Sequence, residues 1–120
     1  PPDWPRPPIC LPHHLLHLPP EGARVAVAGL VLVRQRPGTA KGVIFVTLED
    51  EFGVCNVVIW QKIYLQFRRA VIAGRLLRVT GRVQRQSGVT HVIAEQVEDI
   101  SALLDDLLHL HEPTRAADQP

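Results

Sequence analysis

The chain has 120 residues, of which 46% are hydrophobic and 21% are charged, and its formal net charge is +1. This length suits one domain with a modest core, and no apolar run approaches the length of about eighteen residues that a membrane-spanning helix needs. The first residues lack the basic and apolar regions of a signal peptide. Two cysteines, Cys10 and Cys55, are too few for a disulfide framework or a cysteine-rich metal site. We therefore expect a reducing, cytoplasmic setting and no membrane partner.

The small net charge conceals an asymmetry along the chain. Residues 24–85 contain eleven bases and three acids, whereas the rest of the chain contains two bases and nine acids. A basic body is typical of a protein whose partner is a polyanion, most often a nucleic acid. Arginine is also common on surfaces that contact only solvent. The charge balance alone therefore does not decide between a surface that binds a polyanion and one that binds nothing.

The N-terminal segment, residues 1–20, contains eight prolines. Proline lacks an amide hydrogen and fixes φ, so these residues exclude a long helix or a central strand. We therefore expect a proline-rich arm or linker over 1–20, ahead of a folded body at 21–100. Residues 101–111 have the leucine spacing of a helix with Ser101 as its cap, and 112–120 are expected to form a tail.

The folded body contains five predicted strands and one predicted helix. The strands are the apolar, valine-rich runs 24–33, 43–48, 54–60, 76–84 and 89–96. Between the third and the fourth, over 61–73, apolar residues recur at helical spacing. This order is that of an OB-fold, an all-β, five-stranded barrel that binds oligonucleotides on strands two and three and on flanking loops. An SH3-like barrel would not place an amphipathic helix there.

Alternation along the strands separates a core face from an outer face. On the second strand the outward set contains Phe45 and Thr47, and on the third it contains Asn56 and Val58. An aromatic ring with small polar neighbours is the kind of surface on which single-stranded bases stack. Trp60 follows on the same face, and we expect it to plug the end of the barrel.

Basic residues lie at both ends of this outer face and on the fourth strand. The loop Arg34–Gly42, of sequence RQRPGTAKG, joins strands one and two and holds more positive charge than a turn needs. We predict that the outer face binds single-stranded nucleic acid, with phosphates held by the bases. The candidate contact residues are Arg34, Arg36, Thr39, Lys41, Phe45, Thr47, Asn56, Val58, Arg78, Arg82 and Arg85.

The sequence contains no pattern that predicts catalysis. His13 and His17 could share a helical face as zinc ligands do, but they lack an acidic partner and stand among prolines. The acidic run Glu49–Glu51 has the composition of a turn more than that of a cation site. His91 points outward and is expected to be exposed to solvent. We therefore predict no metal, no cofactor, no small-molecule substrate and no catalytic residue.

Several stretches match more than a general barrel pattern. They are AGLVLVRQRPGTAKG, FVTLED, the FRR of the helix, and LLRVTGRVQR followed by HVIAE and EDIS. With these, residues 19–104 resemble the C-terminal OB domain of the error-prone, C-family bacterial DNA polymerases, relatives of the polymerase III α subunit. The resemblance implies a domain that contacts single-stranded template during lesion bypass. It also implies that the catalytic residues of that family are not on this chain.

Two other functions fit the sequence. A protein-interaction module would use the acidic, leucine-rich C-terminal helix to dock a sliding clamp, a polymerase partner or another domain. A tRNA anticodon-binding domain has the same barrel, but it needs more aromatic side chains on the outer face. The sequence does not decide between DNA and RNA as the bound nucleic acid.

Overall fold

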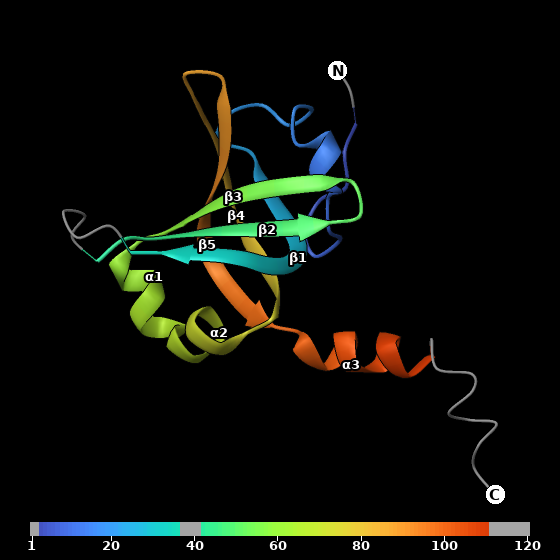
Figure 1. The fold of residues 1–120 in the computed structure, drawn as a ribbon. Helices are drawn as coiled ribbons and strands as arrows, with labels where there is room; N and C mark the ends of the chain where they lie inside the picture. Colours follow the sequence, from blue (N-terminus) through green and yellow to red (C-terminus); the bar gives the residue numbers. More distant parts are fainter. Residues whose placement is uncertain (1–2, 37–41, 111–120) are drawn as a thin grey trace, which may run out of the picture.

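The computed structural model describes residues 3–36 and 42–110, and the side chains of these up to residue 106. Five strands form a closed barrel in the order β1-β2-β3-β5-β4 (Figure 1). The elements are η1 (His13–Leu15), β1 (Arg24–Gln35), β2 (Ile44–Asp50), β3 (Gly53–Ile59), α1 (Gln61–Gln66), α2 (Arg68–Ala73), β4 (Leu76–Gln86), β5 (Val89–Asp99) and α3 (Ser101–Leu110). The predicted all-β, five-stranded fold with helices after the third and fifth strands is confirmed.

Strand β1 closes the barrel because it is long enough to pair with two neighbours. Its first half runs antiparallel to β4 and its second half antiparallel to β2, and Leu30 takes part in both pairings. A side chain on Gly29, at the same point, would come within 2.7 Å of the Glu49 carbonyl oxygen. Glycine there permits the close approach that closure requires. A short parallel pairing of β3 with β5 completes the ring.

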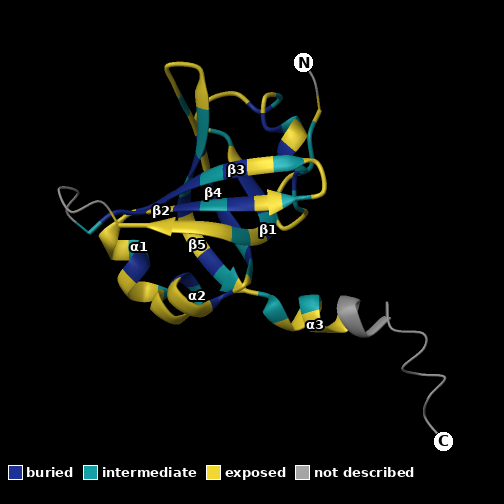
Figure 2. Cartoon of the chain, viewed as in Figure 1, coloured by how far each residue is buried: buried dark blue, intermediate teal, exposed yellow. Residues whose placement is uncertain are grey.

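The barrel interior is filled by alternate residues of the strands, as the alternation predicts. Val46 and Leu48 of β2, Val57 of β3 and Val79 of β4 are each at most 1% exposed. Figure 2 shows buried stretches within the strands, and exposed residues on the outer surface and the helices. Burial also raises the pKa of the Cys55 thiol to about 12, which leaves this group neutral and unreactive.

Two short helices, α1 and α2, close one end of the barrel, and we call residues 61–73 the helical cap. Tyr64 of α1 and Val71 of α2 are buried in the core. The prediction of one continuous helix is wrong in one respect, because Phe67, with φ −117°, breaks it in two. The change of direction lets each short helix turn its own apolar side to the barrel opening. The expectation that Trp60 plugs this end is wrong: its side chain is 54% exposed, and Tyr64 fills the place.

The other end of the barrel is closed by the N-terminal arm, which we define as residues 3–20 (Figure 1). Leu11 and Leu16 are buried within the barrel core. The Leu11 amide donates to the carbonyl oxygen of Ala26 on β1 at 2.7 Å. The arm therefore packs against the barrel and completes its core. The division of the chain into arm, barrel, helix and tail stays a prediction, and the tail at 112–120 lies outside the described residues.

Helix α3 leaves the barrel after β5 and is tied to β4 by polar contacts. The Ser101 hydroxyl oxygen accepts the amide N–H groups of Arg75 and Leu76 at 2.9 and 3.2 Å, and Arg75 forms an ion pair with Asp105 at 3.0 Å. Ser101 was expected to cap this helix. Instead it is the first helical residue, its hydroxyl accepts from Arg75 and Leu76, and its own amide N–H donates to the Asp99 carboxylate. No helix in the described part of the chain is long and apolar enough to cross a membrane.

Replacing Leu11 by alanine should lower the free energy of unfolding by about 2–5 kcal/mol, because it leaves a cavity in the core. Ile9 lies two residues earlier in the arm and is 64% exposed. Ile9→Ala should therefore change the same free energy by no more than about 0.5 kcal/mol. Urea denaturation measures both variants, and equally small effects would show that the arm is not part of the core.

Candidate nucleic-acid interface

The outer face of β1, β2, β3 and β5 carries two neighbouring rows of side chains, and we call these rows the groove face. One row runs through Gln35, Phe45, Val58 and Ile93, and the next through Val33, Thr47, Asn56 and His91. Side chains opposite each other on antiparallel strands lie roughly 4.5–5.5 Å apart. The four predicted members Phe45, Thr47, Asn56 and Val58 are therefore brought together on one surface.

The exposure of these side chains distinguishes contact residues from supporting ones. Phe45 is 36% exposed, and Thr47 and Asn56 are half-buried. Val58 is only 7% exposed, so the expectation that it offers contact surface is wrong. Its place between Phe45 and Ile93 in the row leaves it largely covered, and from there it supports the Phe45 ring.

Three residues of this surface were missed as contacts. Trp60 continues the outward alternation of β3 with extended φ and ψ, so its exposed ring lies on the same side as Asn56. Val33 is exposed beside Thr47, and His91 lies half-buried beside Asn56 rather than free in solvent. The alternation of inward and outward residues along β3 was enough to predict that Trp60 lies on this surface. The other two depend on the register between strands, which no local pattern gives.

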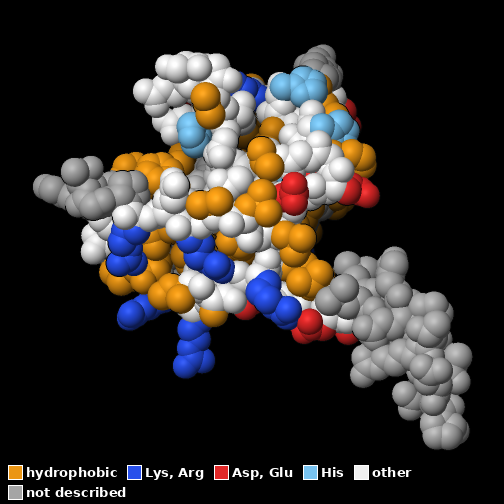
Figure 3. Space-filling model, viewed as in Figure 1, with side chains coloured by type: hydrophobic (Ala, Val, Ile, Leu, Met, Phe, Trp, Pro, Cys, Tyr) orange, Lys and Arg blue, Asp and Glu red, His pale blue; other side chains and the backbone are white. Residues whose placement is uncertain are grey.

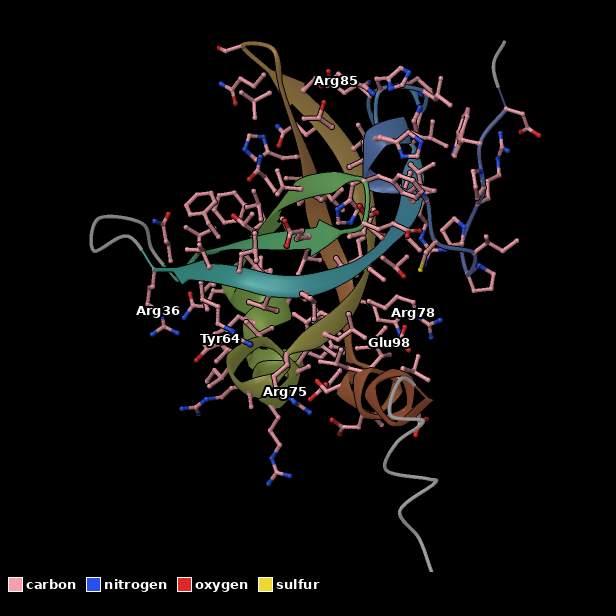
Figure 4. All side chains as sticks on the ribbon, turned by 45° about the vertical axis from the view of Figure 1, so that its right-hand side comes forward. Arg36, Tyr64, Arg75, Arg78, Arg85 and Glu98 are labelled. Carbon is pink, nitrogen blue, oxygen red and sulfur yellow. The ribbon has the colours of Figure 1, made fainter. Side chains whose placement is uncertain are left out.

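The described bases fall into three groups by what their side chains contact, and the first group is paired with acids. Arg78 meets Glu98 through two hydrogen bonds of 3.0 and 2.7 Å, and Arg82 meets Glu95 at 3.1 Å. Hydrogen bonding from Arg78 lowers the pKa of Glu98 below its ordinary value. Both arginines lie on β4, which β1 separates from β2 and β5 separates from β3. Figure 4 shows Arg78 and Glu98 on the side away from Arg36. The placement of Arg78 and Arg82 on the groove face is therefore wrong.

The second group donates to backbone carbonyl oxygens. Arg34 donates from Nε to the carbonyl oxygen of Val71 at 2.6 Å, and from its second nitrogen to that of Gly74, where α2 ends. Arg85 donates to two carbonyl oxygens of the arm, both at 2.7 Å, and so fastens the arm to the β4–β5 hairpin. Both arginines were predicted to meet phosphates. In the structure their donors already have partners within the chain.

The third group has neither an acid nor a carbonyl partner among the described residues. Its members are Arg36, Lys62, Arg68 and Arg69, all exposed. The guanidinium of Arg36 lies 4.8 Å from the ring centroid of Tyr64 on α1 (Figure 4). Figure 3 shows Lys and Arg side chains gathered around the helical cap, on the side of the barrel where α1 and α2 lie. The predicted contacts Thr39 and Lys41 lie outside the described residues.

The acidic run Glu49–Glu51 covers the last two residues of β2 and the first residue of the turn to β3. Asp50 accepts the amide N–H groups of Phe52 and Gly53 at 2.9 and 3.0 Å, and that of His13 in the arm at 2.8 Å. Partial burial alone would raise the pKa of Asp50, but the backbone hydrogen bonds outweigh it and hold the pKa below the ordinary value. Within the described ranges no three His, Cys, Asp or Glu side chains group as a metal site would need. Asp50 thus joins the turn to the arm.

Because the folded-state pKa of Asp50 lies below the ordinary 3.8, its ionised form stabilises the fold at higher pH. This contribution is lost as the pH falls through the folded-state pKa, so the urea midpoint should decline between about pH 5 and pH 2. Asp50→Asn should lower the midpoint at neutral pH and flatten the decline. Glu49→Gln, at the exposed neighbour, controls for the loss of one negative charge. An unchanged pH profile in Asp50→Asn would contradict this role.

Arg34→Ala should lower the free energy of unfolding by about 1.5–3 kcal/mol, because it removes a charged donor from the end of α2. Arg36→Ala removes the same charge two residues away, and should cost only about 0.5–1 kcal/mol for the contact with Tyr64. Urea denaturation of the two variants measures the difference. Similar values would mean that the Arg34 hydrogen bonds do not stabilise the helical cap.

Comparisons with known proteins agree with this geometry. Residues 25–100 match a family model described as OB-fold nucleic acid binding domain, which carries the label tRNA anti-codon. The chain is 66% identical over 86 residues to an error-prone DNA polymerase of Ruegeria pomeroyi, and 57% identical over 83 residues to error-prone DNA polymerase 1 of Rhizobium meliloti. Asparaginyl-tRNA synthetase from Pyrococcus horikoshii superposes with a TM-score of 0.56 at 29% identity, over 67% of this chain and 20% of that chain.

The coverage of these matches decides how much they show. The two polymerase matches take in 72% and 69% of this chain but only 8% and 7% of the relatives' own length. The identities confirm the resemblance to the OB domain of the error-prone polymerases. The family model covers residues 25–100, which is more than half of the chain and includes the strands of the barrel. This chain therefore belongs to the family of OB-fold nucleic-acid-binding domains.

Proposed function

We propose that the groove face binds single-stranded DNA, and that the domain is the template-contacting module of an error-prone, damage-tolerance DNA polymerase. The observation that carries this is one surface with two exposed aromatic rings, Phe45 and Trp60, and at its rim a cation, Arg36, that has no acidic partner among the described residues. Aromatic rings stack on any base, and cations hold the sugar–phosphate backbone. The identity to two error-prone polymerases favours DNA over RNA.

The residues have distinct roles in this proposal. Bases stack on Phe45 and Trp60, while the side chains of Thr47 and Asn56 offer hydrogen bonds to base edges. Each stack contributes roughly 1–3 kcal/mol, so two rings give modest affinity with little sequence preference. Thr39 and Lys41 stay predicted backbone contacts. The arginines Arg34, Arg78, Arg82 and Arg85 are left out of the proposed contacts, since their donors are engaged within the chain.

Phe45→Ala should weaken binding to a fluorescent oligothymidylate by about 1–3 kcal/mol with little change in salt dependence, because stacking releases no counterions. Replacing Arg36 and Lys41 by alanine should instead flatten the log–log slope of affinity against salt by roughly 1.4, at about 0.7 per contact. Fluorescence anisotropy over a salt series measures both effects. Ile9→Ala, at an exposed apolar residue of the N-terminal arm, is the control. Affinity and slope unchanged in both test variants would refute the proposed site.

RNA is the second candidate ligand, and two findings favour it. The matching family model carries the label tRNA anti-codon, and a tRNA synthetase shares 29% identity with this chain. A tRNA anticodon-binding domain was expected to need more aromatic side chains on the outer face, and the exposed Trp60 adds one. Oligouridylate and oligothymidylate of equal length, compared in the same anisotropy assay, separate the two, because RNA-binding domains contact the 2′-hydroxyl. Tighter binding to the RNA would replace the DNA proposal.

Protein docking stays a separate prediction for α3. Leu103 on this helix is exposed and Leu104 is half-buried, so the helix offers apolar side chains to a partner such as a clamp or another polymerase subunit. The cytoplasmic setting expected from the sequence also belongs to the proposal, because a bacterial polymerase meets its DNA there.

A further inference from the structure

The groove face leaves most of the third group of bases without a role. Arg36 borders it, but Lys62, Arg68 and Arg69 lie on the helical cap. We propose that these three residues form a second phosphate-binding surface, over which a single strand passes as it leaves the groove face. The inference rests on the proposed function, because it extends the path of the same bound strand.

The helical cap turns its cations outward because its apolar side is used inside the barrel. Tyr64 and Val71 are buried in the core, and Phe67 is half-buried against it. Ile63 and Ala70 are also half-buried against the core, and the other positions of α1 and α2 are exposed, the three bases among them. Helix α1 begins directly after Trp60, so Lys62, its second residue, is two positions along the chain from the last aromatic residue of the proposed site.

Arg36 connects the groove face with the helical cap. Its guanidinium stands over the Tyr64 ring of α1 at 4.8 Å, and Figure 4 shows the two residues on one side of the molecule. A hollow of about 170 Å³ opens between the end of β1 and α2. Its lining consists of Arg34, Gln35, Arg36, Ile44, Val71 and Ile72. Among the described residues, this lining contains two arginines and no carboxylate.

The sequence keeps acids away from this side of the barrel. No Asp or Glu occurs between Phe52 and Ala94, a stretch that includes β3, the helical cap and β4. A carboxylate does lie beside Gly74 at the C-terminal end of α2, that of Asp99, where Arg34 and Arg75 also act on it. Lys62, Arg68 and Arg69 thus share the helical cap, within eight residues of sequence, and have no described counter-charge. Such a group repels itself and attracts a polyanion.

The test compares two variants of the 120-residue chain that each lose three positive charges. The cap variant is Lys62→Ala/Arg68→Ala/Arg69→Ala. The control variant is Arg6→Ala/Arg24→Ala/Arg75→Ala, whose arginines are exposed and pair with Asp3, Glu95 and Asp105. Each variant and the parent are titrated with oligothymidylates of roughly 5 and 15 nucleotides, near the two ends of the range of about 4–16 that OB-folds occupy. Melting curves check that the variants fold.

We expect the cap variant to bind the short oligonucleotide as the parent does. It should lose the gain in affinity that the parent shows with the long oligonucleotide. Its log–log salt slope with the long oligonucleotide should be flatter by about 2, at about 0.7 for each of three contacts. The control variant should keep both the length dependence and the slope of the parent.

Three other outcomes would exclude the second surface, and one of them would also exclude binding at the groove face. Equal losses in the cap and control variants would mean that net charge acts without a site, and the proposal would be wrong. A cap variant that matches the parent with both oligonucleotides excludes the second surface while the groove-face proposal stands. A parent that binds neither oligonucleotide ends both proposals.

A measurement on the unaltered chain decides the question if the cap variant fails to fold. Backbone amide resonances of residues 61–70 should shift on addition of the long oligothymidylate and stay in place with the short one. A response to the long oligonucleotide that is confined to the groove face would overturn the second surface.

Discussion

Closure of the barrel by β1 is the constraint on which the other features depend. Because this strand pairs with both β2 and β4, and β3 pairs with β5, the ring of strands presents no free edge for another chain to extend. The inward positions are occupied by aliphatic side chains. Any partner must therefore meet outward side chains, loops or the two closed ends. The described aromatic and basic residues of the proposed site, Phe45, Trp60 and Arg36, are exposed and lie in such places.

The positive potential of the surface depends on which basic residues are paired within the fold, and not on the number of basic residues in the sequence. The basic region 24–85 includes four arginines that pair with acids from later in the chain. These arginines are Arg24, Arg75, Arg78 and Arg82. Arg34 and Arg85 are used to hold backbone segments in place. Among the described residues, the bases without an acidic or carbonyl partner lie on the helical cap or, as Arg36 does, beside it, so a nearly neutral protein presents a positive region there.

The parts that the sequence could predict are those that local periodicity determines. Alternation was enough to place Val46 in the core and Phe45 on the outer face, and the change to helical spacing located the helical cap. Periodicity says which side of a strand a residue occupies, but not which strands flank it, and so Arg78 was assigned to the wrong surface. The prolines of the arm predicted that it holds no long helix or central strand, and its described residues contain only the short helix η1. They carry no information on whether an irregular segment packs, and the burial of Leu11 depends on that.

The docked arm has a consequence for how the domain opens. Leu11, Leu16, Trp4 and Leu15 pack against the core. The polar part of the attachment consists of single hydrogen bonds, the paired donors of Arg85 and the Asp50–His13 contact, whereas the strands share continuous ladders. Regions with few apolar contacts and isolated hydrogen bonds open before the rest of a fold. Detachment of the arm would uncover the aliphatic end of an otherwise intact barrel. Exposed apolar patches favour association between molecules, so we expect the docked arm to limit self-association as well as to complete the core.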